Sequence, residues 1–266
     1  MTRKRKKFRS MRPDLEADRP LLGYYVTFQI PDIVEMIGAD WDWLWIDLQH
    51  SPIDLSATVA LVRAAEAAGV YSIVRVGRND SFLIASALDT GASGVMVPMV
   101  NTAAEAEAVV TAAKFAPRGT RSYGSRRLVA LYGLDYADTA NEDTVVFVQI
   151  ESNEALANAE AIAAVDGIDG LIFSPDDVSR ERGLTVVIPR PRNQWAEERQ
   201  AVAAAARKHG KTVGSMACTP EALENALKWG YRLCVGAEGD MVVLTASAQI
   251  SEAMRQTTDK TLGQGT

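Results

Sequence analysis

The chain has little of several residue types on which common site chemistries depend. It contains two cysteines, Cys218 and Cys234, and a predicted helix separates them. This arrangement lacks the spacing of a zinc site, so we expect two reduced thiols in a cytoplasmic protein, neither of them a nucleophile. There are also only two histidines, and one of them, His50, directly follows a buried run.

Other absences exclude whole classes of protein. No apolar run reaches the ~18 residues that a membrane span needs, and no apolar segment follows the basic start as in a secretory signal. No G-x-G-x-x-G follows the first predicted strand, so nothing indicates a dinucleotide site. No lysine stands at the C-terminal end of a predicted strand, which argues against Schiff-base chemistry.

The formal net charge of -6 is unevenly distributed along the 266 residues. Residues 1–12 contain seven basic side chains and no acidic one, so the rest of the chain is more acidic than the total suggests. An acidic body argues against nucleic acid as a partner. We interpret the basic start as a short solvated tail; an arm that touches RNA or a membrane is the alternative.

Strand-like and helix-like segments alternate through most of the chain. The predicted strands are Leu21–Phe28, Trp41–Leu48, Tyr71–Val76, Gly94–Val100, Val145–Glu151, Gly167–Ser174, Lys211–Ala217 and Arg232–Gly236. The predicted helices are Pro31–Ala39, Leu55–Gly69, Asp80–Thr90, Thr102–Phe115, Asn153–Val165, Gln194–His209, Pro220–Trp229 and Asp240–Arg255. Eight such pairs predict an α/β fold, a single-domain (β/α)8 TIM barrel, with an open doubly wound sheet as the alternative.

The domain prediction follows from this pattern. Residues 1–20 form a basic, polar N-terminal segment, residues 21–255 the catalytic barrel, and residues 256–266 a flexible polar tail. Two stretches interrupt the alternation, Pro117–Asp143 and Pro175–Pro191. Connections of this length inside a compact domain are usually functional.

Polar residues stand at the ends of several predicted strands, where TIM barrels carry their chemistry. They are Asp47, Gln49 and His50 after the second strand, Arg75 on the third, Gln149 and Glu151 on the fifth, and Asp176 and Asp177 just past Ser174. Glu151 and Asp177 suit a hard cation such as Mg2+ or Mn2+; alternatively, each carboxylate caps the following helix.

Arg75 and His50 each allow two interpretations. A guanidinium suits a carboxylate or an enolate oxygen, but Arg75 alternatively forms an internal salt bridge to Asp47 or Glu151. His50 is either an acid/base group or a residue that only caps its strand.

Together these residues resemble the HpcH/HpaI family of class II pyruvate aldolases, from about Gly23 to Met254. The resemblance rests on seven motifs in order. They are WLWIDLQH, the arginine of IVRV, Ala87–Gly91, VPMV, Pro117–Arg121, VQIE and Pro175–Ser179.

The resemblance implies a metal-dependent aldolase acting on 4-hydroxy-2-oxo acids through a pyruvate enolate, with Mg2+, Mn2+ or Co2+. Glu151 and Asp177 would hold the metal. Arg75 would stabilise the enolate, with Gln149 near the keto oxygen. The backbone around Asp176–Asp177 would hold the substrate carboxylate, beside Ser174. His50, paired with Asp89, would be the acid/base group. The partners would be a small 2-oxo acid and an aldehyde.

Some residues depart from the family pattern. Ser174 stands where glycine is usual, Tyr24, Tyr25, Phe28 and Gln29 make the first strand end bulkier, and Thr185–Arg192 is unlike the usual loop. These differences favour a changed specificity.

Asp89 lies before the fourth strand, at the opposite end of its own barrel from His50. The family resemblance implies homo-oligomers, trimers or hexamers with an exchanged last helix, and we expect Asp89 to act between subunits. Alternatively, Asp89 only bonds a turn. Two other functions stay open: decarboxylation or condensation of oxaloacetate in a biosynthetic pathway, and a non-catalytic barrel that binds a 2-oxo acid.

Overall fold

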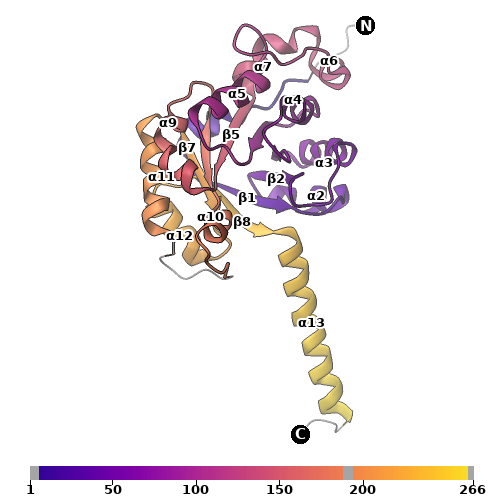
Figure 1. The fold of residues 1–266 in the computed structure, drawn as a ribbon. Coiled ribbons are helices and arrows are strands. Elements are labelled where there is room, and N and C mark those ends of the chain that lie inside the picture. The colour runs from indigo at the N-terminus through magenta and orange to yellow at the C-terminus, as the bar shows by residue number, and fades with distance from the viewer. Residues whose placement is uncertain (1–5, 188–193, 263–266) are drawn as a thin grey trace.

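The computed structural model describes residues 6–187 and 194–262. Its eight strands are all parallel and close into a barrel in sequence order, so the TIM-barrel prediction is confirmed (Figure 1). The strands are β1 (Leu21–Val26), β2 (Trp43–Asp47), β3 (Tyr71–Arg75), β4 (Gly94–Val97), β5 (Val145–Ile150), β6 (Gly170–Phe173), β7 (Thr212–Met216) and β8 (Leu233–Glu238).

Most of the helices cover the outside of the barrel, and the last one projects from it (Figure 1). The helices are α1 (Arg12–Glu16), α2 (Pro31–Ile37), α3 (Leu55–Ala68), α4 (Ser81–Asp89), α5 (Ala103–Ala113), α6 (Arg126–Tyr132), α7 (Ala137–Asp143), α8 (Asn153–Ala157), α9 (Ala159–Ala163), α10 (Pro175–Glu181), α11 (Ala196–Lys208), α12 (Pro220–Lys228) and α13 (Gly239–Leu262), with short 3-10 turns at Gly38–Asp40 and Leu134–Tyr136. Side-chain caps fix several starts, such as Asp54 on Ala57 N–H and the Thr102–Glu105 capping box.

The barrel interior is filled in layers, because alternate residues of each strand point inward. Trp43 and Trp45 of β2 and Val145 and Phe147 of β5 belong to the same buried interior cluster. The next inward positions beyond Trp45 and Phe147 are Asp47 and Gln149. The aromatic and aliphatic side chains inside the barrel are therefore followed by a layer of polar side chains. This polar layer lies at the C-terminal end of the barrel, which we call the mouth.

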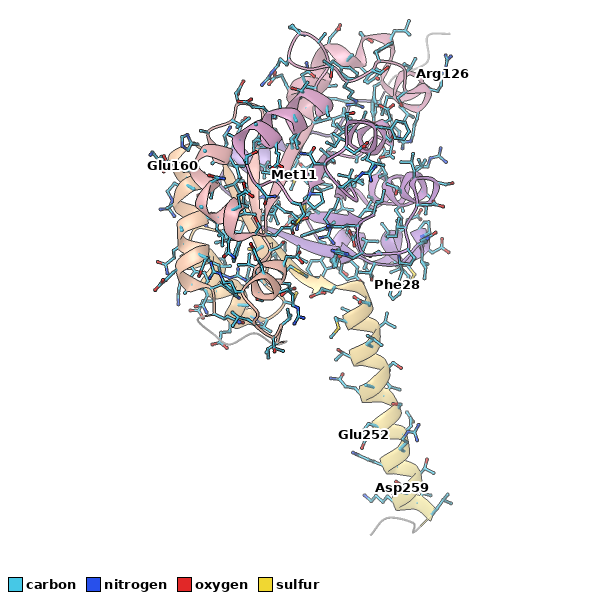
Figure 2. The ribbon with its side chains drawn as sticks, in the orientation of Figure 1. Met11, Phe28, Arg126, Glu160, Glu252 and Asp259 are labelled. Carbon is cyan, nitrogen blue, oxygen red and sulfur yellow. The ribbon has the colours of Figure 1, made fainter. Side chains whose placement is uncertain are left out.

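The N-terminal segment closes the opposite end of the barrel. Met11 is fully buried in the interior cluster, in the middle of the molecule in Figure 2. The neighbouring Arg12 guanidinium forms a salt bridge of 2.6 Å with Asp169, and Ser10 donates a hydrogen bond to the carbonyl of Asp143. The expectation of a solvated tail is therefore wrong for residues 10–12, because the apolar Met11 side chain is buried in the end of the barrel opposite the mouth.

Two further segments differ from their predictions. The interruption at Pro117–Asp143 contains α6 and α7, whose aromatic and aliphatic side chains form a small separate core with Phe115. The last helix, α13, continues to Leu262 instead of ending at Arg255. It runs straight away from the barrel, with side chains projecting on all sides (Figures 1 and 2).

No described helix is both long and apolar enough to cross a lipid bilayer.

Candidate active site

The polar layer at the mouth is organised around Asp47, at the end of β2. The carboxylate is fully buried and accepts hydrogen bonds from the Tyr25 hydroxyl, the Arg75 Nε–H and the Ser51 hydroxyl. It also accepts the backbone N–H groups of Gln49 and His50. Burial alone raises the pKa of Asp47, but the bonds and charge of Arg75 outweigh it and leave the pKa at about 2. Asp47 is therefore ionised, and it fixes both Arg75 and the loop that carries His50.

Arg75 lies across the mouth with 6% of its surface exposed. Its Nε lies 2.7 Å from Asp47 Oδ1, one terminal nitrogen lies 2.7 Å from the Tyr25 hydroxyl, and the other lies 3.4 Å from Gln149 Oε1. Its guanidinium also lies 4.8 Å from the Trp45 ring centroid. The internal salt bridge anticipated as an alternative is thus present, and it holds the guanidinium in one orientation.

Gln149 extends this network to β6. Its amide is fully buried, and its Nε2 donates a 2.7 Å hydrogen bond to Ser174 Oγ. Ser174 precedes α10, and its side chain caps no N–H of that helix. Arg75, Gln149 and Ser174, three residues predicted for the site, therefore form one continuous hydrogen-bonded row across the mouth.

Glu151 is a third buried ionisable group at the mouth, after Asp47 and Arg75, with 2% of its surface exposed. Burial raises the pKa of Glu151 to about 7; the bond from the Met99 N–H and the charge of Arg75 oppose the rise, and the charge of Asp177 adds to it. The charge of Asp177 therefore disfavours ionisation of Glu151. Asp177 itself is exposed, and Asp176 is partly buried beside it in the first turn of α10.

Met99 takes an uncommon backbone conformation next to Glu151. Its φ is +53°, a left-handed value that side chains other than glycine seldom adopt. This conformation accompanies a 2.7 Å hydrogen bond from the Met99 N–H to Glu151 Oε1. No other hydrogen bond reaches Glu151 from the described residues, so its second oxygen is available to a ligand.

The residues present fit a divalent cation. Within the described ranges, no group of three or more His, Cys, Asp and Glu side chains is placed to hold a metal. A two-carboxylate set is nevertheless what Mg2+ commonly uses, with water and substrate as its remaining ligands. A cation would also offset both the burial of Glu151 and its repulsion with Asp177.

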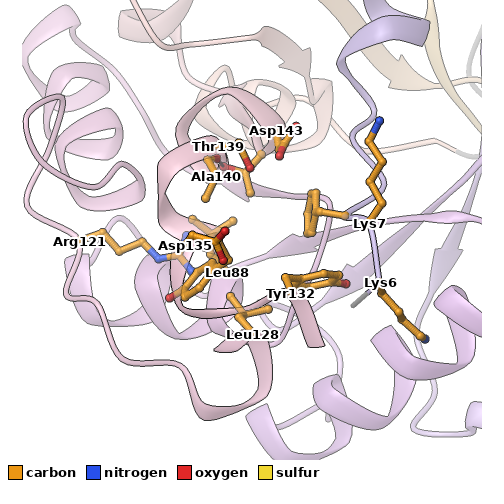
Figure 3. Close-up of a pocket in the computed structure, with 13 residues that line it drawn as sticks. Lys6, Lys7, Leu88, Arg121, Leu128, Tyr132, Asp135, Thr139, Ala140 and Asp143 are labelled. Atoms are coloured by element: carbon orange, nitrogen blue, oxygen red, sulfur yellow. Dashed lines mark hydrogen bonds between the residues drawn. The ribbon is translucent and has the colours of Figure 1, made fainter. Parts of the chain in front are cut away.

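His50 and Asp89 do not meet within one chain. His50 is exposed beside the mouth, on the loop held by Asp47. Asp89 ends α4 at the opposite end of the barrel, where its carboxylate pairs with Arg121 at 2.7 Å. Arg121 lines a cavity of about 320 Å3 there, together with Leu88, Tyr132 and the N-terminal Lys6 and Lys7 (Figure 3).

From the sequence, Asp47 is named only as a polar strand-end residue and an alternative salt-bridge partner of Arg75, and Tyr25 only as one of the bulky residues at the first strand end. Met99 is named only within the VPMV motif. The position of Tyr25 in its strand is the available signal. Gly23 faces the inside of the barrel, where the lack of a side chain leaves room for the Trp43 ring, and Tyr25, two residues later, faces the same side. No comparable signal marks Met99, because its contribution is a backbone N–H.

Comparisons with known proteins agree with this geometry. The family model described as HpcH/HpaI aldolase/citrate lyase matches residues 22–244. A hydroxypyruvate/pyruvate aldolase from Rhizorhabdus wittichii is 38% identical over 216 residues, covering 79% of this chain and 83% of that protein. A 4-hydroxy-2-oxovalerate aldolase from Novosphingobium aromaticivorans is 45% identical over 166 residues, covering 61% of this chain and 63% of that protein.

Solved structures show the same fold along nearly the whole chain. An HpcH/HpaI aldolase/citrate lyase family protein from Burkholderia cenocepacia has a TM-score of 0.84 at 30% identity, covering 92% of this chain and 98% of that one. The citrate synthase SbnG has a TM-score of 0.84 at 26% identity, covering 94% and 99%. A more distant likeness in fold, with a TM-score of 0.57 at 17% identity over 85% and 93%, is to a citrate lyase beta subunit from M. tuberculosis, solved with oxaloacetate and magnesium.

The chain forms a closed barrel with a buried arginine and acidic residues at its mouth, and the family model matches most of its length. We conclude that the chain belongs to the HpcH/HpaI aldolase/citrate lyase family and is a class II pyruvate aldolase family enzyme, a carbon–carbon lyase.

Proposed function

We propose that this protein is a divalent-metal-dependent aldolase that cleaves or forms 4-hydroxy-2-oxo acids through a pyruvate enolate. The observation that carries the proposal is the arrangement of Arg75 beside Glu151. One is a buried, oriented cation and the other a buried carboxyl with a free oxygen. Such a pair suits a reaction in which negative charge develops on the oxygen of a bound 2-oxo acid.

Glu151 and Asp177 would hold the cation, Mg2+, Mn2+ or Co2+. When bound, the ion supplies Lewis-acid stabilisation of negative charge on the substrate oxygens. Arg75 and Gln149 would contact the same oxygens, since both side chains reach the mouth from neighbouring positions in the polar layer. Ser174 and the first turn of α10 at Asp176 would receive the substrate carboxylate.

In the cleavage direction, the bond between C3 and C4 of the substrate breaks. His50 accepts the proton of the C4 hydroxyl, and C4 leaves as the carbonyl carbon of an aldehyde. The bonding electron pair remains on the three-carbon fragment as an enolate, which Arg75 stabilises. Protonation at C3 then gives pyruvate. His50 suits the proton transfer because it lies on a loop fixed by Asp47 yet remains exposed to the incoming substrate.

Asp89 would assist His50 of a neighbouring subunit, since the two residues lie at opposite ends of one barrel. The exposed α13 supports an assembly with an exchanged helix. Beside its first turns is an uncovered cavity of about 580 Å3, lined by α11, α12, β7 and β8 residues such as Ala222 and Met216. We propose that α13 of a second copy covers this face, giving a trimer or hexamer.

The test of the metal site measures pyruvate release from a 4-hydroxy-2-oxo acid, coupled to lactate dehydrogenase, after chelation and after return of Mg2+ or Mn2+. Glu151→Gln and Asp177→Asn should each lose at least about a hundredfold in activity, because each removes one charged ligand. Asp166→Asn is the matched control, since that carboxylate is exposed and its 3.4 Å contact with Arg118 is remote from the mouth. Full activity in the chelated wild-type enzyme would contradict the proposal.

A second candidate function is the decarboxylation of oxaloacetate, or its condensation with another acid in a biosynthetic pathway. The observation that favours it is the likeness to the citrate synthase SbnG over 94% of this chain. The same site would serve, because oxaloacetate also gives a pyruvate enolate when it loses CO2. Incubation with oxaloacetate, with and without an aldehyde, separates the alternatives by CO2 release and by the product formed.

A further inference from the structure

The Tyr25 hydroxyl lies between the two charged groups that define the mouth. It donates a 2.6 Å hydrogen bond to Asp47 Oδ2 and accepts a 2.7 Å hydrogen bond from a terminal nitrogen of Arg75. Tyr25 comes from β1, whereas Asp47 and Arg75 come from β2 and β3. A single hydroxyl therefore joins three neighbouring strands at the site.

The hydroxyl can keep both bonds over the working range of pH. Tyr25 is partly buried, and this burial raises the pKa of the phenol well above its usual value. It therefore stays protonated, as a donor to Asp47 must be. Its oxygen lone pairs remain available to Arg75.

The effect of the bond between Tyr25 and Arg75 follows from the number of N–H donors that Arg75 carries. A guanidinium carries five N–H groups in a fixed plane. One is directed to Asp47, one to Tyr25 and one to Gln149. Two N–H groups remain without a partner among the described residues. Since the three occupied donors fix the plane, the two remaining ones have a set direction.

We propose that Tyr25 is a positioning residue that fixes the Arg75 guanidinium so that its two remaining N–H groups meet the oxygens of a 2-oxo acid as the enolate forms. This inference rests on the proposed function. Asp47 holds the guanidinium at Nε, and Gln149 holds one terminal nitrogen only through a long contact of 3.4 Å. The 2.7 Å bond to the Tyr25 hydroxyl is therefore the main restraint on the other terminal nitrogen. Without the hydroxyl, the released N–H competes for the substrate oxygen in an unsuitable direction.

The ring of Tyr25 has a separate packing role, which the test must leave intact. Its centroid lies 5.2 Å from that of Trp45 in an edge-to-face arrangement. Tyr25→Phe keeps the ring and removes only the hydroxyl. Tyr25→Trp is the second variant, because an indole N–H can donate to Asp47 but cannot accept from Arg75. Tyr24→Phe is the matched control, since Tyr24 precedes Tyr25 in β1 and the structure places its side chain in the outer core, not in the hydrogen-bond network of the mouth.

The experiment follows enolisation directly, by proton NMR of the exchange of pyruvate methyl protons with deuterated water. The full-length enzyme is used with Mg2+ and without an aldehyde. For Tyr25→Phe we expect the exchange rate at saturating pyruvate to fall about tenfold to a hundredfold, as expected for a misdirected catalytic group. The pyruvate concentration that gives the half-maximal rate should change less than about threefold, because the lost interaction belongs to the transition state.

The outcomes separate this inference from the proposed function. Absence of exchange in the wild-type enzyme would count against the proposed function. Exchange in the wild type that is equally fast in Tyr25→Phe, or in a folded Tyr25→Trp, would overturn the role of Tyr25 alone. A loss seen equally in Tyr24→Phe would also overturn it, because it would indicate a general effect on β1. Circular dichroism and thermal melting verify that each variant is folded.

Discussion

Asp47 is the residue on which the mouth depends most, because five hydrogen bonds converge on one buried carboxylate. Its pKa of about 2 lies below the usual value of an aspartate carboxyl, 3.8. A carboxyl with a lowered folded-state pKa stabilises the protein above its unfolded pKa, and this contribution disappears as the pH falls through the folded pKa. The interval of interest is therefore from about pH 4 to about pH 2.

We expect Asp47→Asn to lower the free energy of unfolding by about 3–5 kcal/mol at pH 7, since it leaves the buried Arg75 without its counter-charge. The difference between wild type and variant should shrink as the pH falls from about 4 to about 2, because the unfolded wild-type chain takes up a proton at Asp47 before the folded chain does. Urea titrations from pH 7 down to pH 2 measure this difference. A difference that is constant with pH would contradict the ionised state of Asp47.

The roles proposed for His50 and Arg75 can be distinguished by comparing two reactions, aldol cleavage and oxaloacetate decarboxylation. We expect His50→Ala to abolish aldol cleavage, because the C4 hydroxyl then has no proton acceptor, while oxaloacetate decarboxylation partly survives. Decarboxylation needs the enolate site but no such proton transfer. Parallel assays of pyruvate release and CO2 release measure the two reactions, and an equal loss of both would argue against this separation.

At the level of elements, β1 is tightly packed at Gly23. A Cβ on Gly23 would lie 2.3 Å from Cε2 of the Trp43 ring, and that ring is buried inside the barrel. We expect Gly23→Ala to destabilise the fold by about 1–3 kcal/mol through overpacking. Gly77→Ala is the control, since its Cβ would make only an ordinary 3.6 Å contact with the Leu48 carbonyl. Thermal melting of both variants should shift only for Gly23→Ala.

The last helix is the element with most apolar surface exposed. Its exposed apolar residues are Met241, Val242, Val243, Leu244, Ile250, Met254 and Leu262. If a second copy covers this face, Leu244→Asp should dissociate the assembly, whereas Thr258→Asp, on an exposed polar position near the end of the same helix, should have a smaller effect. Analytical ultracentrifugation measures the mass, and a wild-type monomer would refute the exchange.

The elements also show how far sequence patterns reach. Buried parallel strands could be predicted because runs such as VVFVQI are apolar on both faces. The helices α6 and α7 could not, because Gly124 and Gly133 break the pattern and the two helices are stabilised by packing on Phe115. Arg75, Gln149 and Glu151 could be located by their strand ends. Tyr25 and Met99 could not be placed in the network, because their contacts arise only when the barrel closes.

At the level of the whole molecule, the site is incomplete within one barrel if His50 needs Asp89. A mixing experiment tests this. His50→Ala and Asp89→Ala subunits should each be nearly inactive alone, but subunits mixed under dissociating conditions and reassembled should recover part of the wild-type activity. Some mouths would then combine an intact His50 with an intact Asp89 from a neighbour.

The control mixes His50→Ala with Glu151→Gln subunits. Both of these residues lie at the mouth of one chain, and every subunit in this mixture lacks one of them. No mouth in the mixed assemblies is therefore complete, and we expect no recovery of activity. No recovery in either mixture would indicate that Asp89 serves its own chain through Arg121, as its 2.7 Å ion pair allows.

The bond from Met99 to Glu151 has a consequence for how this enzyme could change its substrate. Because the donor is a main-chain N–H, exchange of the Met99 side chain does not in itself delete the bond. That side chain is 46% exposed, and the backbone of Met99 contacts Glu151, the proposed metal ligand. Asparagine or glycine would even suit the left-handed backbone there. Position 99 is therefore a place where directed evolution can reshape acceptor preference while the acid next to it keeps its anchor.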